Sequence, residues 1–173
     1  YVASSACETI QLAEPRDILR GECINATEQL GLAPSNTRIL DFEVRHFARD
    51  RQGVLDAMVK LNAALRPDLV LVPSSDDTHQ DHFVVSDEAR RAFKHTRILC
   101  YEAPWNNFRF ETTAFVSLTQ EDLERKVAAL SQFVTQSGRP YMDRAYQEAQ
   151  LRFRGVQAGV QYAEAFQVLR WFL

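Results

Sequence analysis

The feature that most constrains the fold is an alternation of short, β-branched apolar runs with longer segments of helical spacing. Runs typical of strands occupy residues 1–4, 38–42, 68–72, 97–101 and 114–118. Residues 15–30 and 54–65 carry apolar side chains at steps of three and four, and Gly31 and Pro67 mark the ends of these two helices. Strands that alternate with helices predict an α/β fold, with a mostly parallel sheet and helices on both faces.

The second half of the chain is less regular. Thr119 is typical of a helix N-cap, and Asp122 three residues later completes the pattern of a capping box. Residues 141–156 predict a further helix, whereas the pattern of residues 165–173 fits a strand or a helix equally well. No repeat or linker is present, so we expect one domain over residues 1–173.

Composition excludes several classes of protein. The 173 residues carry 20 Lys and Arg against 23 Asp and Glu, which argues against a nucleic-acid partner bound through a basic face. No apolar stretch is long enough to span a membrane. The cysteines Cys7, Cys23 and Cys100 are widely spaced and odd in number, so we expect small buried side chains rather than a disulfide framework. With no export signal, this predicts a cytoplasmic location.

The run Leu69-Val70-Leu71-Val72 is continuously apolar, as in a strand buried on both faces. It therefore predicts a strand near the centre of the sheet. Pro73 ends this strand, so residues 74–80 form the loop at its carboxyl end. In open α/β sheets, this edge is where ligands bind.

The densest polar cluster of the chain follows directly, as Ser74-Ser75-Asp76-Asp77-Thr78-His79-Gln80-Asp81-His82. If a helix begins near Gln80, His79 and His82 lie on the same face, one turn apart. Such residues can bind zinc, or a histidine outside the metal shell can donate to an oxyanion or protonate a leaving amine. Asp81 is well placed to hold an imidazole by its other nitrogen. The alternative is an ordinary helix start, since two histidines fall short of the three ligands of a catalytic zinc site.

Several segments together resemble the PIG-L/LmbE-like family of zinc-dependent N-deacetylases. Residues 73–82, read as P-x-x-x-D-x-H-x-D-H, are similar to the second motif of that family. Glu22 to Gly31 resembles its E-x-x-x-A-x-x-x-L-G helix, and Thr135, directly before Gln136, stands where the S-Q region of the family often has serine. Similar segments follow at Tyr101-Glu102-Ala103-Pro104-Trp105 with Phe108, at Lys126-Val127-Ala128-Ala129-Leu130 with Gln136, at Phe153-Arg154-Gly155, and at Tyr162-Ala163-Glu164-Ala165-Phe166.

The resemblance implies a Rossmann-like domain that removes an acetyl group from an N-acetylated sugar resembling N-acetylglucosamine. It implies that His82 is a zinc ligand, that His79 stabilises the tetrahedral oxyanion, and that Asp81 orients His79. It further implies a sugar contact from an arginine of the first helix, for which Arg20, or alternatively Arg16, is the candidate. The family's first motif, A-H-P-D-D-E, is absent from the 173 residues. We therefore expect a domain that lacks its first strand and first metal motif, with weak or absent zinc binding and little activity.

Other candidate residues have two interpretations. Trp105 and Asn106 lie in an aromatic and polar loop that fits either a sugar-binding platform or a loop packed by its own rings. His46 is typical of a surface loop and His95 of a helix end. Glu164 predicts a structural partner for a basic residue such as Arg154.

Besides the enzyme, two functions remain open: a catalytically silent sugar-binding or scaffold domain of the same fold and, less favoured, a nucleotide-type binding domain. The expected partner is a small N-acetylated sugar, and the sequence leaves the oligomeric state open.

Overall fold

The structure is a computed structural model that describes residues 2–5 and 16–173, and it divides into two compact units. The first unit comprises residues 1–44 and 116–164, and the second comprises residues 45–115 and 165–173. Cys7 lies outside the described residues. Among the helices that the structure describes, none is both long and apolar enough to cross a membrane.

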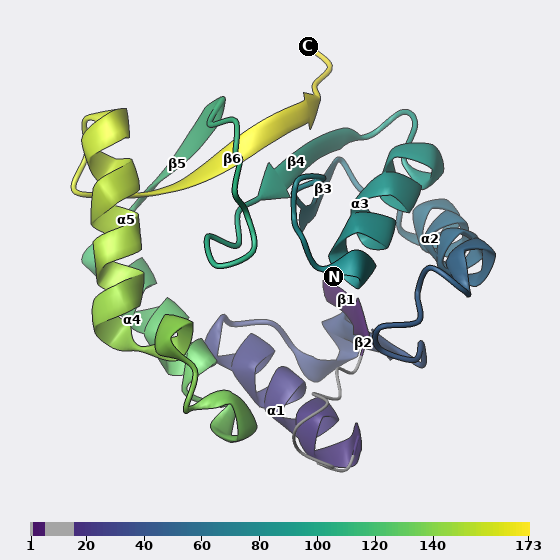
Figure 1. Cartoon of the computed structure of the whole chain (residues 1–173), viewed down its shortest axis with the longest axis horizontal. Helices are drawn as coiled ribbons and strands as arrows, with labels where there is room; N and C mark the ends of the chain where they lie inside the picture. The colour runs from purple at the N-terminus through teal and green to yellow at the C-terminus, as the bar shows by residue number, and fades with distance from the viewer. Residues whose placement is uncertain (1, 6–15) are drawn as a thin grey trace. The chain divides into compact units, whose positions relative to one another are not determined.

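The first unit begins with a strand, a helix and a parallel strand. Strand β1 (Val2–Ser5) pairs in parallel with β2 (Thr37–Leu40), and α1 (Arg16–Gln29) lies between them in the chain (Figure 1). Gly31 follows α1 with φ of +80°, a left-handed conformation that glycine adopts without steric cost. Its N–H donates to the carbonyl of Glu28 at 2.9 Å. The predicted strand–helix–strand start and its terminal glycine are confirmed.

The remainder of the first unit contains α4 (Gln120–Leu130) and α5 (Arg144–Ala158), with short 3-10 turns at Pro34–Asn36, Val134–Gln136 and Pro140–Met142. The predicted capping box is confirmed: the Thr119 hydroxyl accepts from the Asp122 N–H, and the Asp122 carboxylate accepts from the Thr119 N–H. Both carboxylate oxygens of Glu22 accept from Thr135, from its N–H at 2.9 Å and its hydroxyl at 2.6 Å. Thr135 therefore makes this contact at the position where the family often has serine.

The second unit contains α2 (Arg51–Leu65), β3 (Leu69–Pro73), α3 (Gln80–Ala92) and β4 (Arg97–Tyr101). Strands β3 and β4 pair in parallel, and α2 and α3 pack against each other (Figure 1). Side chains of both helices and both strands form one buried cluster, which contains Leu55, Val72, Ala89, Ala92, Phe93, Ile98 and Cys100.

Two further strands, β5 (Ala114–Leu118) and β6 (Tyr162–Arg170), complete the sheet in the order β3-β4-β6-β5. Strand β6 is antiparallel to β4, so the segment for which the sequence left strand and helix open is a strand. The chain thus has the mixed α/β, Rossmann-like fold that the sequence predicts, with parallel pairs at β1–β2 and β3–β4.

The predicted central position of β3 is wrong, because β3 is the end strand of the four-stranded sheet in the described part of the chain. Its burial alternates: Val72 is buried in the cluster of α2 and α3, whereas Leu71 on the opposite face is 53% exposed. A continuously apolar sequence shows that both faces of a strand can be buried. It does not determine which strands lie beside it in the sheet.

Two smaller predictions have different outcomes. Glu164 does pair with a basic residue, but its partner is Lys126 at 2.6 Å and not Arg154. Cys100 is fully buried in β4 and Cys23 is partly buried in α1, both as free thiols. Burial raises the pKa of the Cys100 thiol, so this side chain behaves as the small apolar residue that the sequence predicts.

Candidate functional site

The polar cluster forms a loop at the carboxyl end of β3, where the sequence places it. The Ser74 N–H donates to the carbonyl of Tyr101 at 3.1 Å, which ties the start of the loop to the end of β4. The Ser74 side chain is fully buried, and its hydroxyl accepts from the Asp76 N–H at 3.2 Å. Helix α3 then begins at Gln80, as expected.

Asp77 contacts both histidines of the cluster, one through each carboxylate oxygen. Its Oδ1 accepts from the backbone N–H of His79 at 2.8 Å, and its Oδ2 lies 2.7 Å from Nδ1 of the His82 ring. The Asp77 side chain is 1% exposed, whereas that of His82 is 37% exposed. A single buried carboxylate therefore sets the position of both residues.

His79 is the N-cap of α3, and its ring Nδ1 accepts from the Asp81 N–H at 3.2 Å. Burial and the neighbouring His82 lower the pKa of His79, which favours the neutral ring. Because Nδ1 is the acceptor in this contact, the proton of the neutral ring resides on Nε2. His79 thus presents an N–H donor on the side of the ring away from the helix backbone.

The rings of His79 and His82 stack, with centroids 4.5 Å apart and an angle of 24° between their planes. Since Nδ1 of His82 faces Asp77, Nε2 is the nitrogen left for another ligand. Histidines that bind a metal through one ring nitrogen usually have the other ring nitrogen hydrogen-bonded to a carboxylate or another acceptor, as Nδ1 of His82 is to Asp77.

Asp81 makes a different contact from the one expected. Its carboxylate accepts from the N–H groups of Arg45 and Phe47, the latter at 3.2 Å, while its own N–H faces the His79 ring. The Asp81 carboxylate therefore fixes the backbone turn of residues 45–47, and the carboxylate that orients a ring of this pair is that of Asp77.

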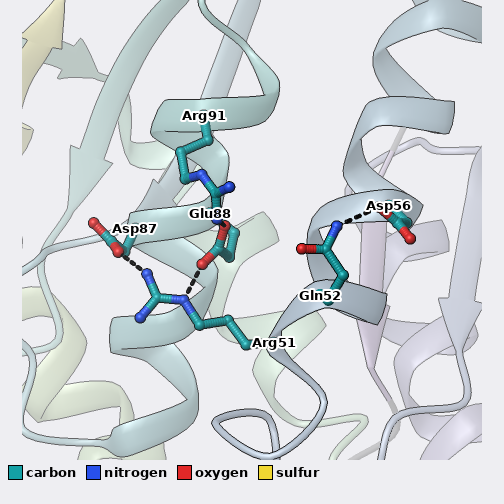
Figure 2. A network of polar contacts seen from close by, with 6 residues as sticks. All are labelled: Arg51, Gln52, Asp56, Asp87, Glu88 and Arg91. Atoms are coloured by element: carbon teal, nitrogen blue, oxygen red, sulfur yellow. Dashed lines mark hydrogen bonds and ion pairs between the residues drawn. The ribbon is translucent and has the colours of Figure 1, made fainter.

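Ion pairs between α2 and α3 hold the helix that carries the site. The Arg51 guanidinium, at the start of α2, contacts the carboxylates of Asp87 and Glu88 on α3, and Arg91 contacts Glu88 at 2.8 Å (Figure 2). The Glu88 side chain is fully buried and is neutralised by these two arginines. The third turn of α3 is thus fixed to the first residue of α2.

The loop that contains Trp105 and Asn106 adjoins the histidine loop. The Asn106 carbonyl accepts from the Thr78 N–H at 3.1 Å, and Asn107 forms a backbone bridge with Asp77. The Trp105 ring is about half exposed. The structure therefore brings these two predicted sugar-binding residues to the same edge as His79, while their binding role stays a prediction.

Sequence reasoning missed two members of this group. It placed Asp77 in the motif P-x-x-x-D-x-H-x-D-H but gave it no contact, although the spacing D-x-H-x-x-H was the available signal for its contact with both histidines. It assigned no role to Tyr101, whose phenol has its pKa raised to about 12 by burial and by the charge of Asp77. That phenol is therefore a permanent hydrogen-bond donor at neutral pH.

The remaining candidates belong to other segments of the chain. Arg20 is on α1 in the first unit, where its guanidinium pairs with Asp41, and its contact with a sugar stays a prediction. His46 is exposed in the turn before α2, and His95 is exposed after α3, as the sequence indicates for both.

The described residues do not complete a metal site. Within residues 2–5 and 16–173, no group of three or more His, Cys, Asp and Glu side chains is arranged to hold a metal ion. His82 fits the part of a single ligand, since Asp77 orients it and Nε2 is available.

Comparison with known proteins gives a family match and similar folds. The family model for PIG-L, described as GlcNAc-PI de-N-acetylase, matches residues 4–93. No curated protein matches the chain.

The solved structures that are similar to the chain include the following three, all below 25% identity, so they show the fold alone. GalB, a 4-carboxy-2-hydroxymuconate hydratase from Pseudomonas putida KT2440, has a TM-score of 0.72 and 19% identity over 91% of this chain and 73% of its own. An N,N'-diacetylchitobiose deacetylase from Pyrococcus horikoshii has a TM-score of 0.70 and 18% identity, and the match covers 98% of this chain and 72% of the deacetylase. The zinc-inhibited form of teicoplanin deacetylase Orf2 has a TM-score of 0.69 and 16% identity, and the match covers 87% of this chain and 73% of Orf2.

The family match covers just over half of the chain and includes β3, the histidine loop and α3. The chain belongs to the PIG-L family.

Proposed function

We propose that this chain is a hydrolase domain that removes the acetyl group from an N-acetylated sugar of the N-acetylglucosamine type. The observation that supports it most is the pair of stacked histidines held by one buried carboxylate at the carboxyl end of β3. The description of the family and the deacetylases among the similar structures favour the same reaction class.

In this proposal His79 acts on the acetamide oxygen. Its Nε2–H is fixed as a donor by the Asp81 N–H on the other nitrogen, and a neutral donor needs no proton from solvent to function. Such a donor stabilises the negative charge that develops on the carbonyl oxygen during attack by water. Trp105 and Asn106 would contact the sugar from the adjoining loop, and Arg20 stays the candidate from α1.

His82 would hold zinc through Nε2, with Asp77 fixing its tautomer. Zinc, when bound, would polarise the acetyl carbonyl and lower the pKa of a water molecule. Because the described residues complete no set of three ligands, we expect weak zinc binding by these residues.

One observation favours a second candidate. The described residues contain no group of three metal ligands, and this is what we expect of a catalytically silent sugar-binding or scaffold domain. The two candidates share the fold and the sugar, and they differ in hydrolysis.

The test compares His79→Ala and His82→Ala with the parent chain, for zinc affinity and, at saturating zinc, for amine released from N-acetylglucosamine. We expect His82→Ala to bind zinc still more weakly than the parent, and His79→Ala to bind zinc as the parent does while the amine released at saturating zinc falls by about 10²–10³-fold. His95→Ala, an exposed histidine after α3, is the matched control and should change neither.

Unchanged zinc affinity in His82→Ala would remove it as a ligand, and a parental rate in His79→Ala would remove it from the reaction. Sugar binding without any amine release in the zinc-loaded parent would instead favour the silent domain.

A further inference from the structure

The loop that follows β4 is closed by hydrogen bonds to a single residue, Ala103. The Ala103 carbonyl accepts from the N–H groups of Asn106 and Asn107, at 2.7 and 2.9 Å. The Ala103 N–H donates in turn to Oδ1 of the Asn107 side chain at 2.6 Å. Because Ala103 is buried, its N–H needs an acceptor within the protein, and Asn107 supplies it. The side chain of Asn107 therefore closes the loop of residues 103–107.

The amide of Asn107 is only half used. Its Nδ2 is buried, and no residue in the described part of the chain accepts a hydrogen bond from it. A buried donor without an acceptor costs free energy, so this nitrogen does not account for the presence of an asparagine. The oxygen, as a neutral acceptor for the Ala103 N–H, is the part of the side chain that the loop uses.

The closed loop is paired with the histidine loop. Asn107 and Asp77 form an antiparallel backbone bridge, and the Asn106 carbonyl accepts from the Thr78 N–H at 3.1 Å. Residues that lie opposite each other in such a pair have Cα atoms about 4.5–5.5 Å apart, so a change in the shape of one strand displaces the other. The backbone position of Asp77 therefore depends on the shape of the loop after β4.

Asp77 in turn determines the arrangement of the two histidines. Its carboxylate accepts from the His79 N–H at 2.8 Å and lies 2.7 Å from Nδ1 of His82. The Asp77 side chain is 1% exposed, so close packing leaves it little room to compensate for a displaced backbone. A continuous series of contacts within the second unit thus leads from the Asn107 side chain to the His82 ring.

We propose that Asn107 is a positioning residue of the candidate site. By closing the loop of residues 103–107, it places the backbone opposite Asp77 and so fixes how the Asp77 carboxylate meets the His82 ring. Asn107 acts through Asp77 and does not itself contact the substrate. Its effect on catalysis rests on the proposed function, whereas the contact between Asp77 and His82 can be measured without any reaction.

The test records the ring nitrogen NMR signals of His82 in the metal-free chain at about pH 8, above the ordinary pKa of histidine. In the parent, the ring proton should reside on Nδ1, which faces Asp77. We expect Asn107→Ala to raise the share of the tautomer with the proton on Nε2, and to weaken zinc binding about tenfold. Asn106→Ala is the matched control, because Asn106 contacts Thr78 through its backbone carbonyl, and it should change neither quantity.

Asn107→Ser is a milder variant, since its hydroxyl is a shorter neutral acceptor, and its His82 spectrum should lie between those of Asn107→Ala and the parent. It replaces Asn107→Ala if that variant does not fold. A parental His82 spectrum in the folded variant, with only a lower unfolding temperature, would overturn the proposal and leave Asn107 a role in stability alone. An equal change in Asn106→Ala would overturn it as well. The proposed function fails separately, if the zinc-loaded parent releases no amine while the His82 spectra still depend on Asn107.

Discussion

The carboxylate of Asp77 contacts the backbone of His79 and the ring of His82, so the geometry of both depends on one side chain. It is also buried, which makes its hydrogen bonds expensive to lose. An acceptor at this position keeps the proton of His82 on Nδ1 and leaves Nε2 without one. The availability of His82 as a ligand therefore depends on a residue that does not itself bind the metal.

We predict that Asp77→Asn weakens zinc binding about 10–100-fold without unfolding the chain. The asparagine oxygen can still accept from the His79 N–H, but its amide group then faces Nδ1 of His82 and favours the tautomer with a proton on Nε2. Competition with a zinc-binding dye measures the affinity. Asp76→Asn, one residue earlier and exposed, is the control. Equal zinc affinity of Asp77→Asn and the parent would show that Asp77 does not set the tautomer.

At the scale of elements, the end of α5 is constrained by Gly155. A methyl group added there would lie 2.6 Å from the carbonyl oxygen of Gln161 and 2.7 Å from that of Val160. Both contacts are with backbone atoms, which cannot rotate away as a side chain does. The turn between α5 and β6 therefore needs glycine at position 155, because the carbonyl groups of residues 160 and 161 approach its Cα too closely for a side chain.

We predict that Gly155→Ala lowers the free energy of unfolding by about 1–3 kcal/mol, the usual cost of overpacking. Gly21→Ala, also within a helix but with open space around its added methyl, should be neutral or should stabilise by about 0.5–1 kcal/mol. Urea unfolding of the two variants measures both values. A Gly155→Ala variant as stable as the parent would show that the turn after α5 can move.

The contact between α4 and α5 predicts how the stability of the chain changes at acid pH. Both guanidinium NH groups of Arg144 on α5 contact the Glu124 carboxylate on α4, and this arginine lowers the pKa of Glu124 to about 2. Because the folded state depresses this pKa, the stabilisation is complete above the ordinary pKa of glutamate. It is lost as the pH falls toward 2.

Thermal unfolding of the parent and of Glu124→Gln from pH 6 to pH 2 tests this. We expect the parent to be the more stable near neutral pH, and the difference between the two to shrink below about pH 4.3. The effect should be small and salt-sensitive, since both side chains are about half exposed. If the difference in unfolding temperature between the parent and Glu124→Gln stays constant over this range, the charge of Glu124 is not what stabilises the folded state.

At the scale of the whole molecule, the sequence predicts most elements, because their signals are local. The capping box at Thr119, the glycine after α1 and the start of α3 at Gln80 all depend on residues within one turn of each other. The position of β3 in its sheet and the antiparallel direction of β6 depend on partners far along the chain, which a local pattern does not specify.

The candidate site divides in the same way. His79 and His82 are recognisable from their spacing, and the structure stacks them. The contacts of Asp81 with residues 45 and 47, and the partner of Glu164, join segments separated by more than 30 positions. A local pattern therefore offers no means of choosing among the available partners.

Fold alone does not identify the reaction. The similar structures include a hydratase as well as deacetylases, at comparable TM-scores. Function in such folds is a property of the groups at the edge of the sheet. The histidine pair and its buried carboxylate are therefore the residues whose variants test whether this chain is a hydrolase.

Because Asp77 contacts the backbone of His79 and the ring of His82 at once, mutational results at this site will not be independent. Replacing any one of the three side chains disturbs the other two, so the losses from single variants will sum to more than the loss from the triple variant. A double-mutant cycle, rather than a ranking of single substitutions, is the appropriate way to apportion the roles of His79 and His82.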